Sequence, residues 1–220
     1  MEAPISKRLL RDVNDLAETG PPLGIFIKKT NMSNIRMMLV GPEGPYENCL
    51  FFFNITFPKK YPIHSPSVIF QCPYSIRCHP NLYMSGKVCL SILGTWAGPP
   101  WTPLMSLNTI AQTILSILDS EPLRNEPGYV SATFKTIEPY TKYVEYVCLK
   151  ESANLYRQSM TNTLPEKYED FRDEIMQTLV INKEKINKKI EVINMNDKKV
   201  VPVIYSNSSY NGEKHFIEPL

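Results

Sequence analysis

Residues 49–57 read CLFFFNITF, and successive side chains in this stretch alternate between two faces. One face carries the apolar side chains of positions 49, 51, 53, 55 and 57, whereas the other carries Leu50, Phe52, Asn54 and Thr56. A period of two residues is that of an extended strand, whose side chains point to opposite sides of a sheet. Similar apolar runs, separated by turn-rich residues, cover residues 24–29, 35–41 and 67–72. The sequence therefore predicts a four-stranded antiparallel meander.

Helical patterns precede and follow these strands. Before them, one helical face is apolar and the opposite face is basic; the apolar residues are Ile5, Leu9, Val13 and Leu16, and the basic ones are Lys7, Arg8 and Arg11. After them, apolar residues from Leu107 to Leu118 predict a central helix, with Ser106 placed to cap its first turn. A further apolar stripe runs from Tyr168 to Ile193, with Pro165 as a helix start. The order helix, sheet, helix, helix predicts an α+β fold.

Composition narrows the class of protein. The net charge of +2 and the apolar fraction of 43% are typical of a soluble globular chain and give no sign of a nucleic-acid-binding surface. The longest apolar run, Cys49–Phe53, is far too short to span a bilayer, and residues 1–4 contain no apolar signal region. We expect a soluble, unsecreted protein that binds neither nucleic acid nor membrane.

The cysteine count and the distribution of charge point to the middle of the chain. The five cysteines form an odd set in a chain without a secretory signal, so we expect free thiols; they are Cys49, Cys72, Cys78, Cys89 and Cys148. Residues 61–130 hold only 6 charged side chains, whereas residues 151–200 hold 18. The first region is typical of a core with a site, and the second of a solvated helix.

A segment between the sheet and the central helix concentrates reactive side chains: residues 78–93 read CHPNLYMSGKVCLSIL. One hypothesis is zinc binding by Cys72, Cys78, His79 and Cys89, but no pair has the short spacing of zinc ligands, so no metal is expected. A second hypothesis is a cysteine hydrolase that uses Cys89, His79 and Asn81. His79 and Asn81 lie so close in the sequence that Asn81 could hardly orient the imidazole, which argues against this hypothesis.

A third hypothesis comes from resemblance. Residues 79–93 resemble the active-site segment of ubiquitin-conjugating enzymes, with a His-Pro-Asn tripeptide, a cysteine eight residues after the asparagine, and then Leu-x-Ile-Leu. Further landmarks of that family follow in the same order and spacing; they are Gly41-Pro42, Pro45-Tyr46, Phe57-Pro58, Tyr61-Pro62, Ser65-Pro66 and Trp101 with Pro103. Within the family, residues 86–96 (GKVCLSILGTW) and 125–128 (NEPG) are most similar to Z-type members.

The resemblance implies an α+β ubiquitin-conjugating fold and a cysteine acyl transferase. Cys89 would accept ubiquitin or a ubiquitin-like protein as a thioester and pass it to a lysine of a protein substrate, with or without a ligase. The side-chain amide of Asn81 would stabilise the oxyanion of the tetrahedral intermediate, although a turn-stabilising asparagine is an alternative role. His79 would be structural. Glu126 would gate the incoming lysine, with Asn125 as the alternative.

The resemblance also implies partners. A surface shared by the activating enzyme and by RING or HECT ligases would consist of Lys7, Arg8, Arg11, Ile63, Pro103 and Leu104. Because the surface is shared, recharging and ligase binding should alternate. ATP would be used by the activating enzyme, so no cofactor is expected on this chain. We expect a monomer that works in the cytoplasm or the nucleus.

Residues 1–150 are expected to form the catalytic core, and residues 151–220 a C-terminal extension with a long amphipathic helix and a tail. Ser91 departs from the family pattern, because most members carry an aspartate at this position, two residues after the cysteine. Z-type members share the serine, which indicates altered activation of the amine. Two other functions stay open: a non-catalytic binder of ubiquitin or of a ligase, which would normally lack the cysteine, and a thiol hydrolase of ubiquitin-like modifiers.

Overall fold

The chain forms two compact units in a computed structural model that describes residues 7–195 and 216–220. The sheet unit comprises the described part of Met1–Gly41 together with Leu50–Cys72 and Asn81–Leu118. The helical unit comprises Pro42–Cys49, Pro73–Pro80 and the described part of Asp119–Leu220. The chain therefore enters each unit more than once.

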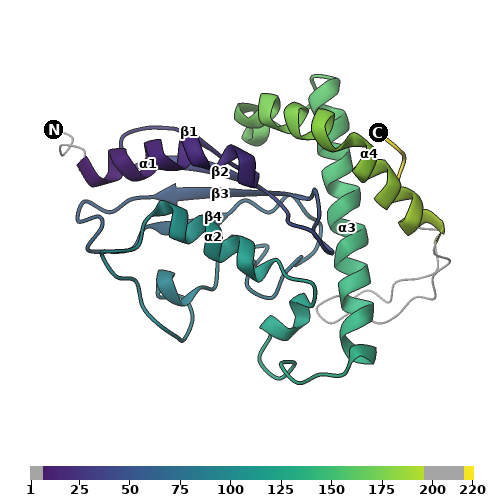
Figure 1. Cartoon of the computed structure of the whole chain (residues 1–220), viewed down its shortest axis with the longest axis horizontal. Helices are drawn as coiled ribbons and strands as arrows, with labels where there is room; N and C mark the ends of the chain where they lie inside the picture. The colour runs from purple at the N-terminus through teal and green to yellow at the C-terminus, as the bar shows by residue number, and fades with distance from the viewer. Residues whose placement is uncertain (1–6, 196–215) are drawn as a thin grey trace. The chain divides into compact units, whose positions relative to one another are not determined.

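The described part of the sheet unit contains two helices, four strands and two short 3₁₀ turns, and Figure 1 shows how its helices and strands are arranged. In chain order these are α1 (Lys7–Thr19), η1 (Pro21–Leu23), β1 (Ile25–Lys29), β2 (Asn34–Val40), β3 (Leu50–Thr56), β4 (Ser67–Phe70), η2 (Ser91–Leu93) and α2 (Leu107–Ile117). The strands pair in the order β1-β2-β3-β4, and every pair is antiparallel. The predicted meander and the α+β fold class are confirmed.

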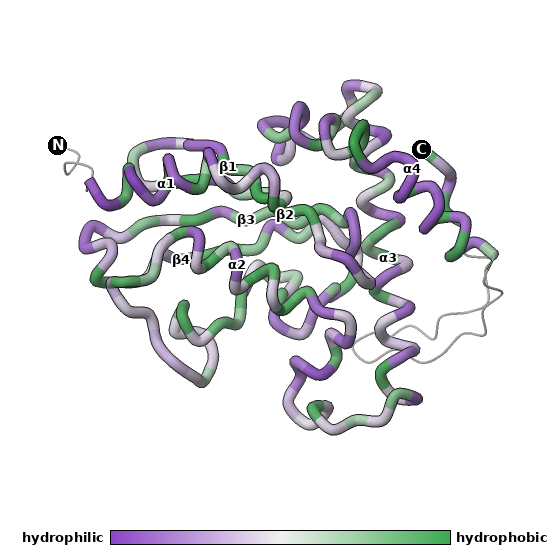
Figure 2. Tube along the Cα trace, viewed as in Figure 1, coloured by the Kyte–Doolittle hydropathy of each residue, from purple (hydrophilic) through white to green (hydrophobic). Residues whose placement is uncertain are grey.

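Strand β3 lies in the interior of the sheet and is buried along most of its length. Leu39 on β2 pairs with Phe51, and Phe53 pairs with Phe70 on β4. Side chains from Leu50 to Phe53 are buried on both faces, and alternation between buried and exposed begins only at Asn54. The predicted strand is confirmed, and both faces of its first half are buried, which fits the apolar residues Leu50 and Phe52 on its second face. Figure 2 shows the resulting hydrophobic concentration along the inner strands.

Both helices of the sheet unit contribute an apolar face to its core. Leu9, Val13 and Leu16 of α1 are buried, and α1 contacts both α2 and β1. Ile5, the first residue of the predicted apolar face, lies outside the described residues. Ser106 caps α2 as predicted: its hydroxyl accepts the Thr109 N–H at 3.4 Å, and the Thr109 hydroxyl accepts the Ser106 N–H at 3.1 Å. This reciprocal capping box fixes where α2 begins.

The helical unit is built around a long helix that the sequence pattern did not predict. Its elements are η3 (Pro122–Asn125), α3 (Phe134–Met160), η4 (Glu166–Phe171) and α4 (Arg172–Met195). Pro139 lies inside α3, where proline usually ends a helix, and this obscures the pattern. Ile137, Tyr140 and Val144 nevertheless recur at helical spacing and are buried. Because α3 runs through residue 150, the expected boundary between core and extension falls inside a continuous helix.

Helix α4 packs against α3 and carries the predicted apolar stripe, including buried Ile175, Ile186 and Ile190. Hydrophobic and hydrophilic residues alternate along it in Figure 2. Pro165 precedes a 3₁₀ turn rather than an α-helix, so the predicted start is seven residues too early: the α-helix begins at Arg172. None of the helices described by the structure has an apolar stretch long enough to cross a lipid bilayer.

Two asparagine side chains of α4 bind the last described residues, 216–220, by hydrogen bonds. The Asn194 amide donates to the Ile217 carbonyl at 2.9 Å and accepts the Ile217 N–H at 3.0 Å. Asn187 makes the same pair of hydrogen bonds with Leu220, at 3.2 and 2.8 Å. Ile217 is buried. Residues 216–220 are therefore part of the helical unit, whereas residues 201–215 of the expected tail lie outside the described residues.

Three buried tyrosines make the helical unit sensitive to alkali. Burial raises the pKa of Tyr46, Tyr74 and Tyr156 well above the ordinary value of 10.0. Above pH 10 the unfolded state loses these protons before the folded state does, so the free energy of unfolding falls as the pH rises. In a titration to high pH, the buried tyrosines should ionise last, as measured by tyrosinate absorbance. We expect the far-ultraviolet circular dichroism signal of the folded protein to be lost at the same pH. Ionisation of all 12 tyrosines near pH 10 with an unchanged dichroism spectrum would contradict this.

Candidate active site

Cys89 lies at the end of a tight reversal of the chain that begins at Asn81. Leu82 pairs with Val88 in an antiparallel bridge, and the Tyr83 N–H donates to the Lys87 carbonyl at 2.9 Å. Gly86 closes this reversal at a φ of 94°, a left-handed conformation that favours glycine. A Cβ at this position would also meet the Ile69 side chain at 2.8 Å. The reversal brings Asn81 and Cys89, eight residues apart in the sequence, into direct contact.

Asn81 holds the backbone of Cys89 through two hydrogen bonds. Its main-chain carbonyl accepts the Cys89 N–H at 2.9 Å, and its side-chain Nδ2 donates to the Cys89 carbonyl at 2.7 Å. Asn81 is buried, so these bonds form away from water. The turn-stabilising role considered for Asn81 is thus visible in the structure. The oxyanion role stays a prediction.

Thr95 also binds the Cys89 segment, and sequence reasoning did not single it out. Its Oγ1 accepts the Leu90 N–H at 3.0 Å, and its hydrogen faces two acceptors, the Val88 carbonyl at 2.6 Å and the more distant Leu90 carbonyl at 3.1 Å. A threonine six residues after a cysteine is no recognisable motif. Its role follows from the 3₁₀ turn η2 and from Gly94, whose φ of 69° reverses the chain and returns Thr95 to the cysteine.

Cys89 is only 1% exposed in this structure, and its neighbours Val88 and Leu90 are apolar and buried. Ser91, two residues after Cys89, lies close to the loop that follows η2. Gly98 belongs to this loop, and a Cβ on Gly98 would meet the Ser91 Cβ at 2.9 Å. The close approach explains the glycine at position 98, because a Cβ on any other residue there would collide with the Ser91 side chain.

The other cysteines lie in different surroundings. Cys49, Cys78 and Cys148 are buried, Cys72 is half-buried, and all five cysteines are free thiols. Burial raises the pKa of the Cys49 thiol to about 12, which makes it a poor nucleophile at neutral pH. Among residues 7–195 and 216–220, no group of three or more His, Cys, Asp or Glu side chains could hold a metal ion.

His79 and the two gate candidates belong to the helical unit. His79 is fully buried, with its ring centroid 6.0 Å from that of Tyr46. Glu126 forms an ion pair with Arg77 at 3.4 Å, and both side chains are mostly buried. The Asn125 amide donates to Asp119 at 3.0 Å. The side chains of both gate candidates thus already bind another residue, and both gate assignments stay predictions.

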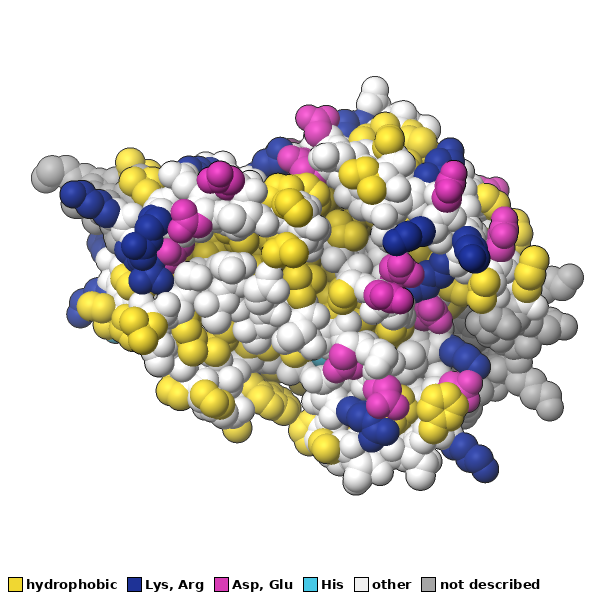
Figure 3. Space-filling model, viewed as in Figure 1, with side chains coloured by type: hydrophobic (Ala, Val, Ile, Leu, Met, Phe, Trp, Pro, Cys, Tyr) yellow, Lys and Arg dark blue, Asp and Glu magenta, His cyan; other side chains and the backbone are white. Residues whose placement is uncertain are grey.

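Two of the residues predicted to bind partners are strongly exposed apolar side chains. Ile63 is 64% exposed and Leu104 is 92% exposed. Pro103 is exposed as well, as are Lys7 and Arg11. Figure 3 shows Lys and Arg side chains gathered over the first part of α1, with hydrophobic side chains close by.

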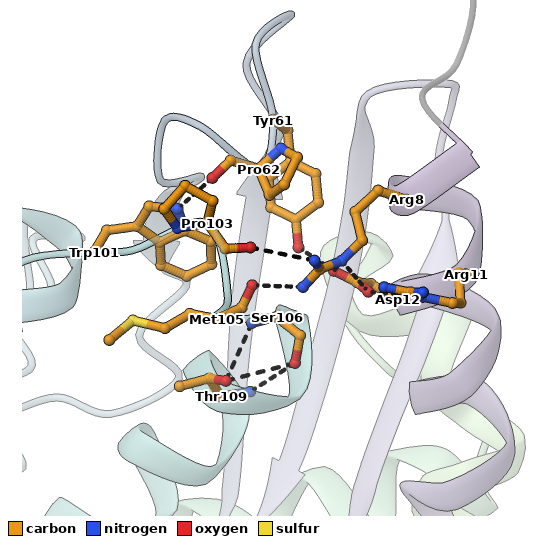
Figure 4. Close-up of polar contacts among 10 residues, drawn as sticks. All are labelled: Arg8, Arg11, Asp12, Tyr61, Pro62, Trp101, Pro103, Met105, Ser106 and Thr109. Carbon is orange, nitrogen blue, oxygen red and sulfur yellow. Dashed lines mark hydrogen bonds and ion pairs between the residues drawn. The ribbon is translucent and has the colours of Figure 1, made fainter.

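Arg8 differs from the solvated surface cation that the helical pattern predicts. Its guanidinium pairs with Asp12 at 2.8 Å and donates to the carbonyls of Pro103 at 3.2 Å and Met105 at 2.8 Å (Figure 4). The Tyr61 hydroxyl also donates to Asp12. Arg8 therefore links α1 to the segment that carries Leu104. Lys7 and Arg11 are exposed, and Arg11 also lies 3.9 Å from Asp12.

These contacts predict different effects for two neighbouring basic residues. Arg8→Ala should lower the free energy of unfolding by about 1–3 kcal/mol, because buried Asp12 loses a charged donor. Lys7→Ala should change it by less than about 0.5 kcal/mol, since Lys7 is exposed. Urea denaturation of both variants measures the difference. Equal stability of the two variants would show that the Arg8 contacts contribute little.

The comparison with known proteins agrees with this site. Residues 8–149 match the family model described as "Ubiquitin-conjugating enzyme". "Ubiquitin-conjugating enzyme E2 Z" of Xenopus tropicalis is 40% identical over 127 residues, which cover 56% of this chain and 40% of that protein. The human protein of the same name is 39% identical, with 56% and 36% covered. "Probable ubiquitin-conjugating enzyme E2 25" of Arabidopsis thaliana is 33% identical over 177 residues, with 74% and 28% covered.

The chain spans two fifths or less of the length of these relatives. The match with the family model nevertheless covers well over half of the chain and includes Asn81, Cys89 and Glu126. The four-stranded meander between α1 and α2 and the segment that carries Cys89 both lie within it. The chain belongs to the ubiquitin-conjugating enzyme family.

Proposed function

We propose that the chain accepts ubiquitin or a ubiquitin-like protein from an activating enzyme as a thioester on Cys89, and transfers it to a lysine of a protein substrate. The observation that carries the proposal is the backbone-fixed position of Cys89 beside Asn81 within the segment that matches the family. The names of the relatives, "Ubiquitin-conjugating enzyme E2 Z" among them, support the same reaction class.

Loading is a thioester exchange. The Cys89 sulfur, as thiolate, attacks the carbonyl carbon of the incoming thioester, and the tetrahedral intermediate collapses with expulsion of the thiolate of the activating enzyme. One thioester replaces another, so the step needs little driving force and no cofactor on this chain. ATP is used earlier, by the activating enzyme. Cys89 suits the carrier role because a sulfur nucleophile is also a good leaving group.

Discharge is an aminolysis. The lysine nitrogen attacks the carbonyl carbon held on Cys89, the carbonyl oxygen becomes an oxyanion, and the Cys89 sulfur leaves as an isopeptide bond forms. The nitrogen must lose a proton, for which the proposal assigns Glu126, with Asn125 as the alternative. We assign stabilisation of the oxyanion to Asn81, whose amide nitrogen carries a second hydrogen besides the one donated to Cys89.

The proposal extends to partners and setting. The exposed side chains of Lys7, Arg11, Ile63, Pro103 and Leu104 form the surface for the activating enzyme and for RING or HECT ligases, with Arg8 holding the segment that carries Leu104 in place. A chain with five free thiols suits the reducing cytoplasm or nucleus. We propose that the protein acts there as a monomer.

A loading assay tests the proposal. The protein is mixed with ATP, ubiquitin or a ubiquitin-like protein, and each of a panel of activating enzymes, and the products are separated on a non-reducing gel. We expect an adduct that disappears on treatment with thiol and is absent from Cys89→Ala. A ubiquitin-binding protein without catalytic activity, or a hydrolase, would form no such adduct with any activating enzyme, and that result would overturn the proposal.

The gate assignment predicts a selective defect. Glu126→Ala should slow discharge to free lysine by about a hundredfold, because the attacking amine loses a proton acceptor. Loading should be unchanged, since no amine takes part in it. Glu121→Ala is the matched control: it removes an acid from the same segment, one that pairs with Arg124 at 2.8 Å. A larger discharge defect in Asn125→Ala than in Glu126→Ala would transfer the role to Asn125.

A further inference from the structure

We propose that Thr95 is a positioning residue for Cys89: its hydroxyl fixes the two peptide groups that flank the cysteine, and so sets the direction of the thiol. The inference rests on the proposed function, because it concerns how the acyl carrier is presented. It starts from the hydrogen bonds of the residues around Cys89, all of which belong to the sheet unit.

Each peptide group beside Cys89 is held at both of its ends. In the group that precedes Cys89, the Val88 carbonyl accepts from the Thr95 hydroxyl at 2.6 Å, and the Cys89 N–H donates to Asn81 at 2.9 Å. In the group that follows, the Cys89 carbonyl accepts from the Asn81 amide at 2.7 Å, and the Leu90 N–H donates to the Thr95 hydroxyl at 3.0 Å. In each of the two peptide groups, Asn81 thus binds one end and Thr95 binds the other.

This arrangement fixes the backbone dihedral angles of Cys89. The orientations of the two flanking peptide planes define φ and ψ of the residue between them, and these angles determine where its Cα–Cβ bond points. Reactions that require attack along a defined direction lose rate steeply when the reacting atom is displaced by about 1 Å. Asn81 alone holds only one end of each plane, so each plane could still tilt about that end.

A hydroxyl is the group that this position requires. It must accept from the Leu90 N–H and donate to the Val88 carbonyl at the same time, and Val88 and Leu90 are both buried. Valine has the shape of threonine but can do neither, and its methyl group also keeps water from filling the place. Serine can do both. Thr95 as a whole is exposed, so a substitution there removes no core side chain.

The chain path brings Thr95 to this place by a short route. After Cys89 it makes the single 3₁₀ turn η2, and Gly94 follows in the left-handed region, with its N–H donating to the Ser91 carbonyl at 2.9 Å. The Thr95 N–H then donates to the Leu90 carbonyl at 3.2 Å. The main chain therefore holds Thr95 in register beside Leu90, and the hydroxyl adds the contacts that reach across Cys89.

Three variants separate positioning from general stability. Thr95→Val removes all the hydroxyl contacts, and Thr95→Ser keeps them. Thr113→Val is the matched control: it removes a hydroxyl that donates to the Thr109 carbonyl at 2.7 Å within α2 and does not contact the Cys89 segment. Each variant is compared with the wild type in single-turnover loading over a range of activating-enzyme concentrations, and in discharge to free lysine.

We expect Thr95→Val to lower the maximal loading and discharge rates by about tenfold or more, with half-saturation by activating enzyme within about twofold of wild type. Thr95→Ser should retain rates within about threefold of wild type, and Thr113→Val should match the wild type. Wild-type rates in Thr95→Val would overturn the inference, as would an equal loss in Thr113→Val. If the wild type itself does not load, the proposed function fails instead.

A second readout needs no ubiquitin and so separates the two failures. Iodoacetamide alkylates the thiolate of Cys89 with loss of iodide, and mass spectrometry of the Cys89 peptide gives the rate. Because Cys89 is 1% exposed, loosening its backbone should speed this reaction by about threefold while acyl transfer slows. Among the three variants Thr95→Val, Thr95→Ser and Thr113→Val, faster alkylation with slower transfer is expected only of Thr95→Val. An unchanged alkylation rate in Thr95→Val would contradict the positioning role, whatever the transfer assay shows.

Discussion

Cys89→Ser is expected to turn the labile adduct into an ester that survives thiol treatment. The serine oxygen occupies the place of the sulfur and can accept the same acyl group, but an oxygen ester reacts far more slowly with thiols and amines than a thioester does. Loading should be slower than in the wild type, because a hydroxyl is a weaker nucleophile than a thiolate. Discharge to lysine should fall by orders of magnitude. The loaded product should therefore accumulate and remain on a reducing gel.

Cys72→Ser is the matched control for this prediction, because Cys72 is a half-buried thiol of the same sheet unit. Its adduct should remain sensitive to thiol and should discharge at the wild-type rate. A thiol-resistant adduct on Cys72→Ser, or a thiol-sensitive adduct that persists on Cys89→Ser, would place the acyl group on a different residue.

Asn81→Ala is expected to slow discharge by a factor of about 10² to 10³, the usual loss when one oxyanion donor is removed. The variant should also be less stable by about 1–3 kcal/mol, because the buried carbonyl of Cys89 loses its donor. Asn108→Ala, on the exposed side of α2, is the control and should show neither effect. Single-turnover discharge to free lysine and urea denaturation measure the two consequences.

Alkylation of Cys89 separates the two roles of Asn81. Iodoacetamide reacts at a saturated carbon, so no oxyanion develops on a carbonyl and an oxyanion donor has no influence on the rate. A changed alkylation rate in Asn81→Ala would report loss of the hydrogen bonds that hold Cys89. An unchanged rate together with slow discharge would assign Asn81 to the oxyanion alone. Discharge at the wild-type rate would contradict both roles.

The sheet unit was predictable from local patterns. The alternation in residues 49–57 indicated β3, and the apolar spacing after Ser106 indicated α2, because these elements bury one face at a regular period. Helix α3 was not predictable in the same way. Pro139 interrupts its pattern, and the long helix is held by burial of residues such as Tyr140 and Val144 in the helical unit.

The site was predictable where it depends on residue type and spacing, and not where it depends on the path of the backbone. Cys89 and Asn81 could be singled out because a thiol and an amide occur at a recognisable spacing. Thr95 could not, since its role arises from a 3₁₀ turn and a left-handed glycine that return it to the cysteine. Arg8 donates hydrogen bonds to Pro103 and Met105 in the segment before α2. These partners are separated from Arg8 by 95 and 97 positions in the sequence, so no local pattern reveals the contact.

Mass spectrometry of the loaded chain tests the central claim most directly. The protein is incubated with ATP, a modifier and an activating enzyme that supports loading, digested without reducing agent, and the modified peptide is identified. We predict that the C-terminal residues of the modifier are attached through a thiol-sensitive bond to the peptide that contains Cys89. Attachment to a peptide containing Cys49, Cys72, Cys78 or Cys148, with Cys89 unmodified, would contradict the account.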